Sequence, residues 1–72
     1  MIEWKPDKEF LDFLLEKITR EFEDEGKPFN PQKVVDYVEE MRTGTLYGRN
    51  QYHGFKISGY YQKEFEAYKA SK

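Results

Sequence analysis

A periodic run of large apolar side chains between residues 10 and 22 places the strongest constraint on the fold. On a helical wheel these side chains fall within roughly 140° of one another, which is the width of a face that packs against a core. Pro6 suits a first helical turn, acidic Asp7 favours the positive end of a helix dipole, and Gly26 is a typical stop. The run therefore predicts an amphipathic helix from about residue 6 or 7 to residue 25. Its apolar face consists of Phe10, Leu11, Leu14, Leu15, Ile18 and Phe22.

A second helix is predicted after residue 30. The side-chain oxygen of Asn30 can cap it, and Pro31 occupies the first helical position, where no amide hydrogen is needed. Gly44 marks its end. Because the connection over residues 26–29 is short, we expect the two helices to pair as an antiparallel hairpin. The apolar residues of the second helix are Val34, Val35, Tyr37, Val38 and Met41.

Residues 44–59 differ in kind from these segments, because they hold four of the five glycines of the chain. Such a density of glycine is typical of turns. We expect a loop packed on the helices, and a short β-hairpin around residues 48–50 is the alternative. A last amphipathic helix, from about residue 60 to residue 70, would use Ser58 as its cap. Its apolar face would consist of Tyr61, Phe65 and Tyr68.

These elements predict a mainly α-helical fold in which residues 1–72 form one small domain. Three helices are expected, an antiparallel hairpin and a C-terminal helix, with a glycine-rich and aromatic-rich loop or short β-hairpin between the second and third. The chain has no cysteine, so its stability must come from apolar burial, to which six Phe, six Tyr and one Trp contribute. The N-terminus lacks the features of a secretory signal, and no apolar run is long enough to cross a membrane. We expect a cytoplasmic protein without a membrane partner.

Charge is distributed unevenly along the chain. Residues 1–40 carry six Lys and Arg against twelve Asp and Glu, whereas residues 41–72 carry six against two. The two halves could meet partners of opposite charge or attract each other within one fold. Glu21 and Glu25 fall inside the apolar stripe of the first helix, so we expect the patch between them to pair with the segment 42–56. The expected cationic partners are Arg42, Arg49 and Lys56.

Motifs for catalysis or cofactor binding are missing from the sequence. The chain has one histidine and no cysteine, and it contains no nucleophile elbow, P-loop or dinucleotide-binding motif. His53 has no metal-ligating neighbours at a suitable spacing, so we expect a loop histidine and no metal. We therefore expect a protein that is not an enzyme and that has no cofactor.

Elimination and surface composition together favour a small protein-interaction module, such as an adaptor, inhibitor or regulatory subunit. A homodimer is a specific form of this expectation, since self-association would extend a small core. Phe13 lies about 60° outside the apolar stripe, and Trp4 precedes the helix, so at least one of them is expected at the surface. Trp4 could instead fold back on the C-terminal helix. The candidate contacts to a partner protein, of unknown identity, are Trp4, Phe13, Tyr47, Arg49, Tyr52 and Phe55.

Nucleic-acid binding is the alternative. Basic and aromatic residues alternate in the segment 42–56, a composition that can stack bases and track phosphates, although a sequence pI near 5.4 argues against it. A third option is that the acidic face of the first helix mimics nucleic acid. The candidate nucleic-acid contacts are Arg42, Arg49, Tyr52, His53 and Lys56.

Overall fold

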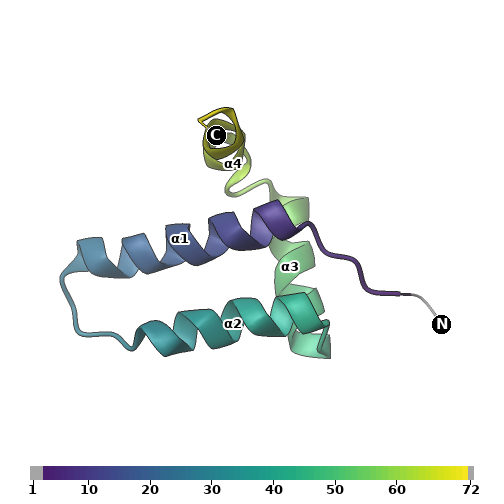
Figure 1. Cartoon of the computed structure of the whole chain (residues 1–72), viewed down its shortest axis with the longest axis horizontal. Coiled ribbons are helices and arrows are strands. Elements are labelled where there is room, and N and C mark those ends of the chain that lie inside the picture. Colours follow the sequence, from purple (N-terminus) through teal and green to yellow (C-terminus); the bar gives the residue numbers. More distant parts are fainter. Residues whose placement is uncertain (1–2, 72) are drawn as a thin grey trace.

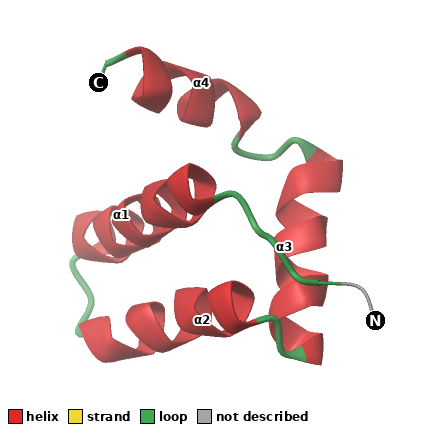
Figure 2. Cartoon of the chain, turned by 45° about the vertical axis from the view of Figure 1, so that its right-hand side comes forward, coloured by secondary structure: helices red, strands yellow, loops and turns green. Residues whose placement is uncertain are grey.

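The computed structural model describes residues 3–71, which form four helices and no strand (Figure 1). The helices are α1 (Lys8–Glu25), α2 (Pro31–Thr43), α3 (Leu46–Ser58) and α4 (Gln62–Ala70). α1 and α2 lie side by side and antiparallel, α3 crosses both of them on one side, and α4 lies against α1 (Figures 1 and 2). None of the helices in this part of the chain is long and apolar enough to span a bilayer.

The predicted hairpin is confirmed, including its caps. The Asp7 carboxylate accepts a hydrogen bond from the backbone N–H of Glu9 at 3.0 Å, so Asp7 is the N-cap and the helix itself begins at Lys8. Asn30 caps α2 in the same way, and Pro31 is its first residue. Both α1 and α2 end at a glycine in the left-handed conformation, as local sequence signals predict.

The loop or β-hairpin predicted for residues 44–59 is wrong, because most of this segment is the helix α3. Thr45 caps the helix by accepting a hydrogen bond from the backbone N–H of Gly48 at 3.0 Å. Gly48 is buried where α3 crosses α2, and a Cβ atom at this position would lie 2.0 Å from the carbonyl oxygen of Glu40. The glycine that resembles a turn signal therefore permits close contact between two helices.

The C-terminal helix begins later than predicted. Ser58 is the last residue of α3 and not the cap of α4; its hydroxyl accepts a hydrogen bond from the backbone N–H of Tyr60 at 3.2 Å. Gly59, with a φ of 66°, ends α3 and changes the direction of the chain, and α4 begins at Gln62 without a side-chain cap. The predicted apolar face is confirmed: Tyr61 and Phe65 are buried, and the partly buried Tyr68 packs against the core.

Aromatic rings form a large part of the core around the fully buried Leu14 and Met41. Phe13, which was expected outside the apolar stripe, is only 3% exposed. Its ring centroid lies 5.8 Å from that of Tyr61 and 5.4 Å from those of both Phe65 and Tyr68. The expectation of Phe13 at the surface is wrong, because α4 covers a second side of α1 and widens the buried face beyond the stripe that meets α2.

Trp4 packs against the junction of α2 and α3 and not on the C-terminal helix. Its indole N–H donates a hydrogen bond to the backbone carbonyl of Met41 at 2.6 Å, and its ring lies edge-on to Tyr52 with centroids 5.4 Å apart. The guanidinium carbon of Arg49 lies 5.2 Å from the centroid of the Trp4 ring, and the Arg49 Nε–H donates to the carbonyl of Gly44 at 2.8 Å. The N-terminal segment is thereby attached to the body of the domain.

The predicted pairing between the acidic end of α1 and the segment 42–56 is wrong. Arg42 pairs with Glu39, one turn earlier on the same helix, with 3.0 Å between Arg42 Nε and Glu39 Oε1. Lys56 Nζ lies 4.0 Å from a carboxylate oxygen of Asp7, at the opposite end of α1. Because α3 crosses the hairpin near the start of α1, its cations do not face the acidic end.

Candidate functional site

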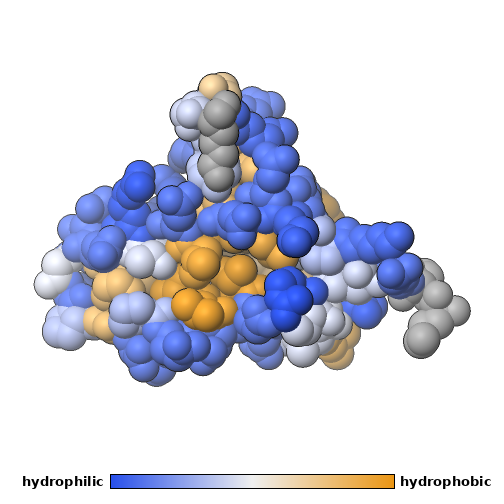
Figure 3. Space-filling model, in the orientation of Figure 1, coloured by the Kyte–Doolittle hydropathy of each residue, from blue (hydrophilic) through white to orange (hydrophobic). Residues whose placement is uncertain are grey.

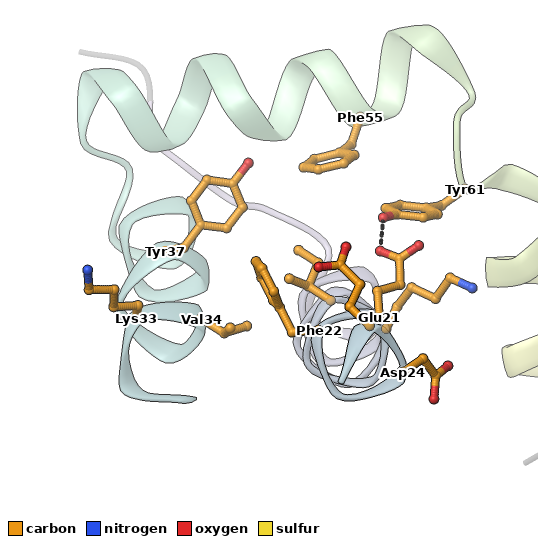
Figure 4. Close-up of a pocket in the computed structure, with 11 residues that line it drawn as sticks. Glu21, Phe22, Asp24, Lys33, Val34, Tyr37, Phe55 and Tyr61 are labelled. Carbon is orange, nitrogen blue, oxygen red and sulfur yellow. Dashed lines mark hydrogen bonds between the residues drawn. The ribbon is translucent and has the colours of Figure 1, made fainter. Parts of the chain in front are cut away.

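A groove of about 890 Å³ lies on the α3 side of the hairpin, between α1, α2 and α3 (Figure 4). Its existence follows from helix lengths. α1 has 18 residues and is about 27 Å long, while α3 crosses the hairpin near only one end. The remaining length of the hairpin has no third helix over it, and side chains there line an open groove.

The interior of the groove is apolar. Phe22 projects upward from α1 between the helices, Val34 points toward it from α2, and Phe55 reaches in from α3 (Figure 4). Phe22 is 40% exposed even though it belongs to the apolar stripe of α1. The full apolar and aromatic lining consists of Ile18, Phe22, Val34, Tyr37, Phe55 and Tyr61.

Two stacked ring pairs hold this lining in place. Phe22 stacks on Phe29, with centroids 5.3 Å apart and ring planes at 19° to each other. Phe55 stacks on Tyr61 at 5.4 Å with the same interplanar angle. Because each ring is fixed by a neighbour, the apolar surface is organised before anything binds to it.

The rim of the groove is charged, and the charge differs between its two sides. α1 contributes three carboxylates, Glu21, Asp24 and Glu25, together with Lys17, whereas α2 contributes Lys33. Asp24 points outward at the edge of the groove (Figure 4). No basic residue lies in the last turn of α1. Acidic residues at a helix C-terminus are unfavourable with the helix dipole, so this helix end is not optimised for its own stability.

Two tyrosine hydroxyls connect the walls of the groove. Tyr61 donates a hydrogen bond to Glu21 Oε1 at 2.7 Å, which joins the start of α4 to α1. Tyr37 donates to Gln51 Oε1 at 2.7 Å, which joins α2 to α3. Burial raises the pKa of Tyr37 above its ordinary value, and Tyr47 adds to this shift.

The Tyr61 hydroxyl is expected to make the fold sensitive to alkaline pH. Burial, followed by the hydrogen bond to Glu21, raises the pKa of Tyr61 well above its usual 10.0. Above pH 10 the unfolded chain loses this proton while the folded chain keeps it, so the free energy of unfolding falls by up to about 1.4 kcal/mol per pH unit. This contribution to the free energy of unfolding is lost completely only when the pH exceeds the pKa of Tyr61 in the folded protein.

A Tyr61→Phe variant is expected to be about 1 kcal/mol less stable at pH 7, because it lacks the hydrogen bond. Its stability should fall less steeply than that of the wild type between pH 10 and pH 11. Urea unfolding of both proteins at several pH values measures the difference. Parallel stability profiles would show that the Tyr61 hydroxyl has no such role.

The six candidate partner contacts do not form one surface. Phe13 and Tyr52 are buried, while Trp4 and Arg49 are half-buried and in contact with each other. Tyr47 is 52% exposed on α3. Of the six, Phe55 lines the groove.

The five candidate nucleic-acid contacts are also dispersed. Tyr52 is buried, and its hydroxyl accepts a hydrogen bond from the backbone N–H of Asp7 at 2.9 Å, so its ring is not free to stack on a base. His53 is exposed beside Trp4, with centroids 5.5 Å apart. The three cations, Arg42, Arg49 and Lys56, make the contacts described above. Nucleic-acid binding stays a prediction, and the five candidate contacts do not form one surface in residues 3–71.

Sequence reasoning missed Ile18, Phe22 and Val34 as site residues, because it assigned the apolar faces of α1 and α2 to a buried core. Helix length was the available signal, because the apolar stripe of α1 is longer than the stretch that one crossing helix can cover.

Apolar surface is also visible between α1 and α2 on the face away from α3 (Figure 3). Val35 is 41% exposed, lies about 100° around α2 from Val34 and does not line the groove. It offers a matched control for Phe22.

Within residues 3–71, no group of three or more His, Asp or Glu side chains is placed to hold a metal ion. Comparison of the chain with protein-family models, with curated proteins and with solved structures finds no match.

Proposed function

We propose that this chain is a small non-enzymatic interaction protein whose groove receives an amphipathic helix from another protein. The observation that carries the proposal is an ordered apolar groove, with Phe22 exposed in it, beneath a rim of three carboxylates. Exposed apolar surface costs free energy in water, and a partner side chain of the size of Leu or Phe gains about 1.5–3 kcal/mol when it is fully buried.

The shape of the groove selects the form of the partner. Helices form its walls, and such grooves accept the apolar face of an amphipathic helix, with anchors spaced three and four residues apart. Each anchor would enter between Phe22 and Phe55, where rings are already fixed by stacking. The partner therefore contributes two or three large apolar residues on one helical face.

The charges of the rim select the sequence of the partner. Lys or Arg on the edge that lies against α1 would face Asp24 and Glu25, and an acidic residue on the other edge would face Lys33. Complementary charges of this kind speed association and fix orientation more than they add affinity. Binding is expected to weaken as salt screens these charges.

A selection from random peptides tests the proposal without a known partner. Twelve-residue peptides displayed on their encoding messenger RNA are selected on immobilised wild-type protein. We expect enriched peptides to combine large apolar residues at helical spacing with Lys or Arg. These peptides should lose at least tenfold in affinity for a Phe22→Asp variant and retain affinity for a Val35→Asp variant.

The two variants are matched because the original side chains are almost equally exposed, at 40% and 41%. Circular dichroism confirms that both are folded before binding is compared. The proposal is wrong if no peptide is enriched above a blank support, or if the enriched peptides bind the Phe22 variant as well as the wild type.

A further inference from the structure

The outer face of α3 exposes large aliphatic side chains. Leu46 is 79% exposed and Ile57 is 84% exposed. α3 lies at the edge of the domain, with α1 and α2 on one side of it only (Figure 2). These side chains lie outside the groove, whose α3 contribution is Phe55. They are two exposed apolar positions, about 16 Å apart along the helix, that the proposed function does not use.

Two polar residues, Asn50 and His53, lie between them on the same face. With Leu46 and Ile57 they have spacings of four, three and four residues, which place all four within roughly 60° around the helix. Asn50 and His53 are both exposed. The outer stripe of α3, defined by these four residues, therefore has apolar ends and a polar centre.

The outer stripe has the same order when it is followed from either end. If two copies of α3 pack antiparallel about a two-fold axis near its midpoint, Leu46 of each chain lies opposite Ile57 of the other. Asn50 then lies opposite His53. Apolar residues therefore meet apolar residues at the two ends of the stripe, and an amide meets an imidazole at the centre. We infer that the outer stripe of α3 pairs with the same stripe of a second copy of this chain.

The central pair can hydrogen-bond in either histidine tautomer. An Asn amide has both donors and an acceptor, and a neutral imidazole has one donor and one acceptor. The His53 ring lies edge-on to Trp4, at 5.5 Å, and to Tyr52, at 6.0 Å, which restricts its position before the chains meet. A polar pair at the centre of a helical interface fixes the register of the two helices.

The position beside the stripe leaves room for close approach by another helix at this face. Gly54 lies inside α3 beside the stripe, and a Cβ atom there would have nothing within 4 Å. Glycine lowers helix propensity, and no neighbouring atom of the single chain requires a residue this small here. Close approach by a second backbone is a use that glycine serves. A different partner protein would not require the symmetric order of the stripe, whereas a two-fold dimer does.

The dimer is expected to be weak. A single pair of helices buries less than about 1,200 Å², which is typical of transient association. The experiment must therefore detect both contact and register at high protein concentration. The absence of cysteine from the chain makes single introduced cysteines specific probes.

Disulfide crosslinking tests the register. Leu46→Cys and Ile57→Cys proteins are oxidised at about 0.5 mM, each alone and as an equal mixture. In the antiparallel pair the two 46 positions lie about 16 Å apart along the axis, too far for a disulfide, whereas position 46 lies opposite position 57. We expect the mixed disulfide to form at least tenfold faster than either homodimeric disulfide.

A Lys63→Cys protein, altered at an exposed site on α4, measures the rate of random collision. Two results would overturn the inference: a mixed disulfide that forms no faster than this control, or homodimeric disulfides that form as fast as the mixed one. Neither result would bear on the groove, because Phe22 and the peptide selection concern a different surface.

Discussion

Replacement of Gly48 by alanine is expected to lower the free energy of unfolding by about 3 kcal/mol. The added Cβ atom would lie 2.0 Å from the backbone carbonyl oxygen of Glu40 and 2.7 Å from the backbone nitrogen of Met41. Backbone atoms cannot move aside as a flexible side chain can, so α3 must shift away from α2. Overpacking of this kind typically costs about 1–3 kcal/mol, and a clash with backbone belongs at the upper end.

Gly54→Ala is the matched control, because it makes the same chemical change in the same helix. A Cβ atom at position 54 meets open space, and alanine favours a helix over glycine by about 0.8–1.0 kcal/mol. We therefore expect this variant to be more stable than the wild type. Urea unfolding at low micromolar concentration, well below the range in which the weak dimer is expected, compares the two. Equal effects of the two substitutions would mean that α3 does not press against α2 at Gly48.

Trp4→Ala is expected to destabilise the domain by about 3 kcal/mol. The substitution removes the indole ring from its contacts with Tyr52 and Arg49 and leaves the Met41 carbonyl without its donor. Truncation of a large aromatic residue costs about 3–5 kcal/mol, and the half-exposed position of Trp4 places it at the lower end.

Trp4→Phe separates the two contributions. Phenylalanine keeps an aromatic ring against Tyr52 but cannot donate to Met41, so we expect a loss of about 1 kcal/mol. Thermal unfolding followed by far-ultraviolet circular dichroism measures both variants. If Trp4→Ala were as stable as the wild type, the ring would not secure the N-terminal segment, and it would again be a candidate partner contact.

The parts of the fold that could be predicted from sequence are those determined by near neighbours. Asp7 and Asn30 cap helices through amides two residues away, and Gly26 and Gly44 end them. The stripe of α1 has a helical period over more than three turns. Each of these signals lies within a few residues of the structure that it specifies, so the hairpin and its boundaries could be read directly.

The parts that could not be predicted depend on contacts between distant residues. Position 48 of α3 needs a glycine because the backbone of Glu40 lies against it, and the sequence alone does not show that contact. Phe13 is buried because α4 returns to α1, more than fifty residues further along the chain. In both cases a local rule was overridden by tertiary packing.

The candidate site was missed for a related reason. Periodicity shows that Phe22 belongs to an apolar face, but it does not show where α3 crosses that face. The crossing point decides which members of the stripe become core and which line a groove. Composition did indicate the acidic end of α1, although its expected pairing with Arg42 or Lys56 does not form.

Charge reversal at the rim tests the proposed function most directly. A peptide from the selection is titrated calorimetrically into wild-type protein and into an Asp24→Lys/Glu25→Lys variant. Lysines suit the C-terminal end of α1, so the variant should be at least as stable as the wild type. We predict roughly tenfold weaker binding to the variant at low salt and a smaller difference at about 0.5 M salt.

The same peptide with its basic residues changed to glutamate should show the reverse preference and bind the variant more tightly than the wild type. Equal affinity of each peptide for both proteins would contradict the account, since the acidic rim would then have no part in recognition.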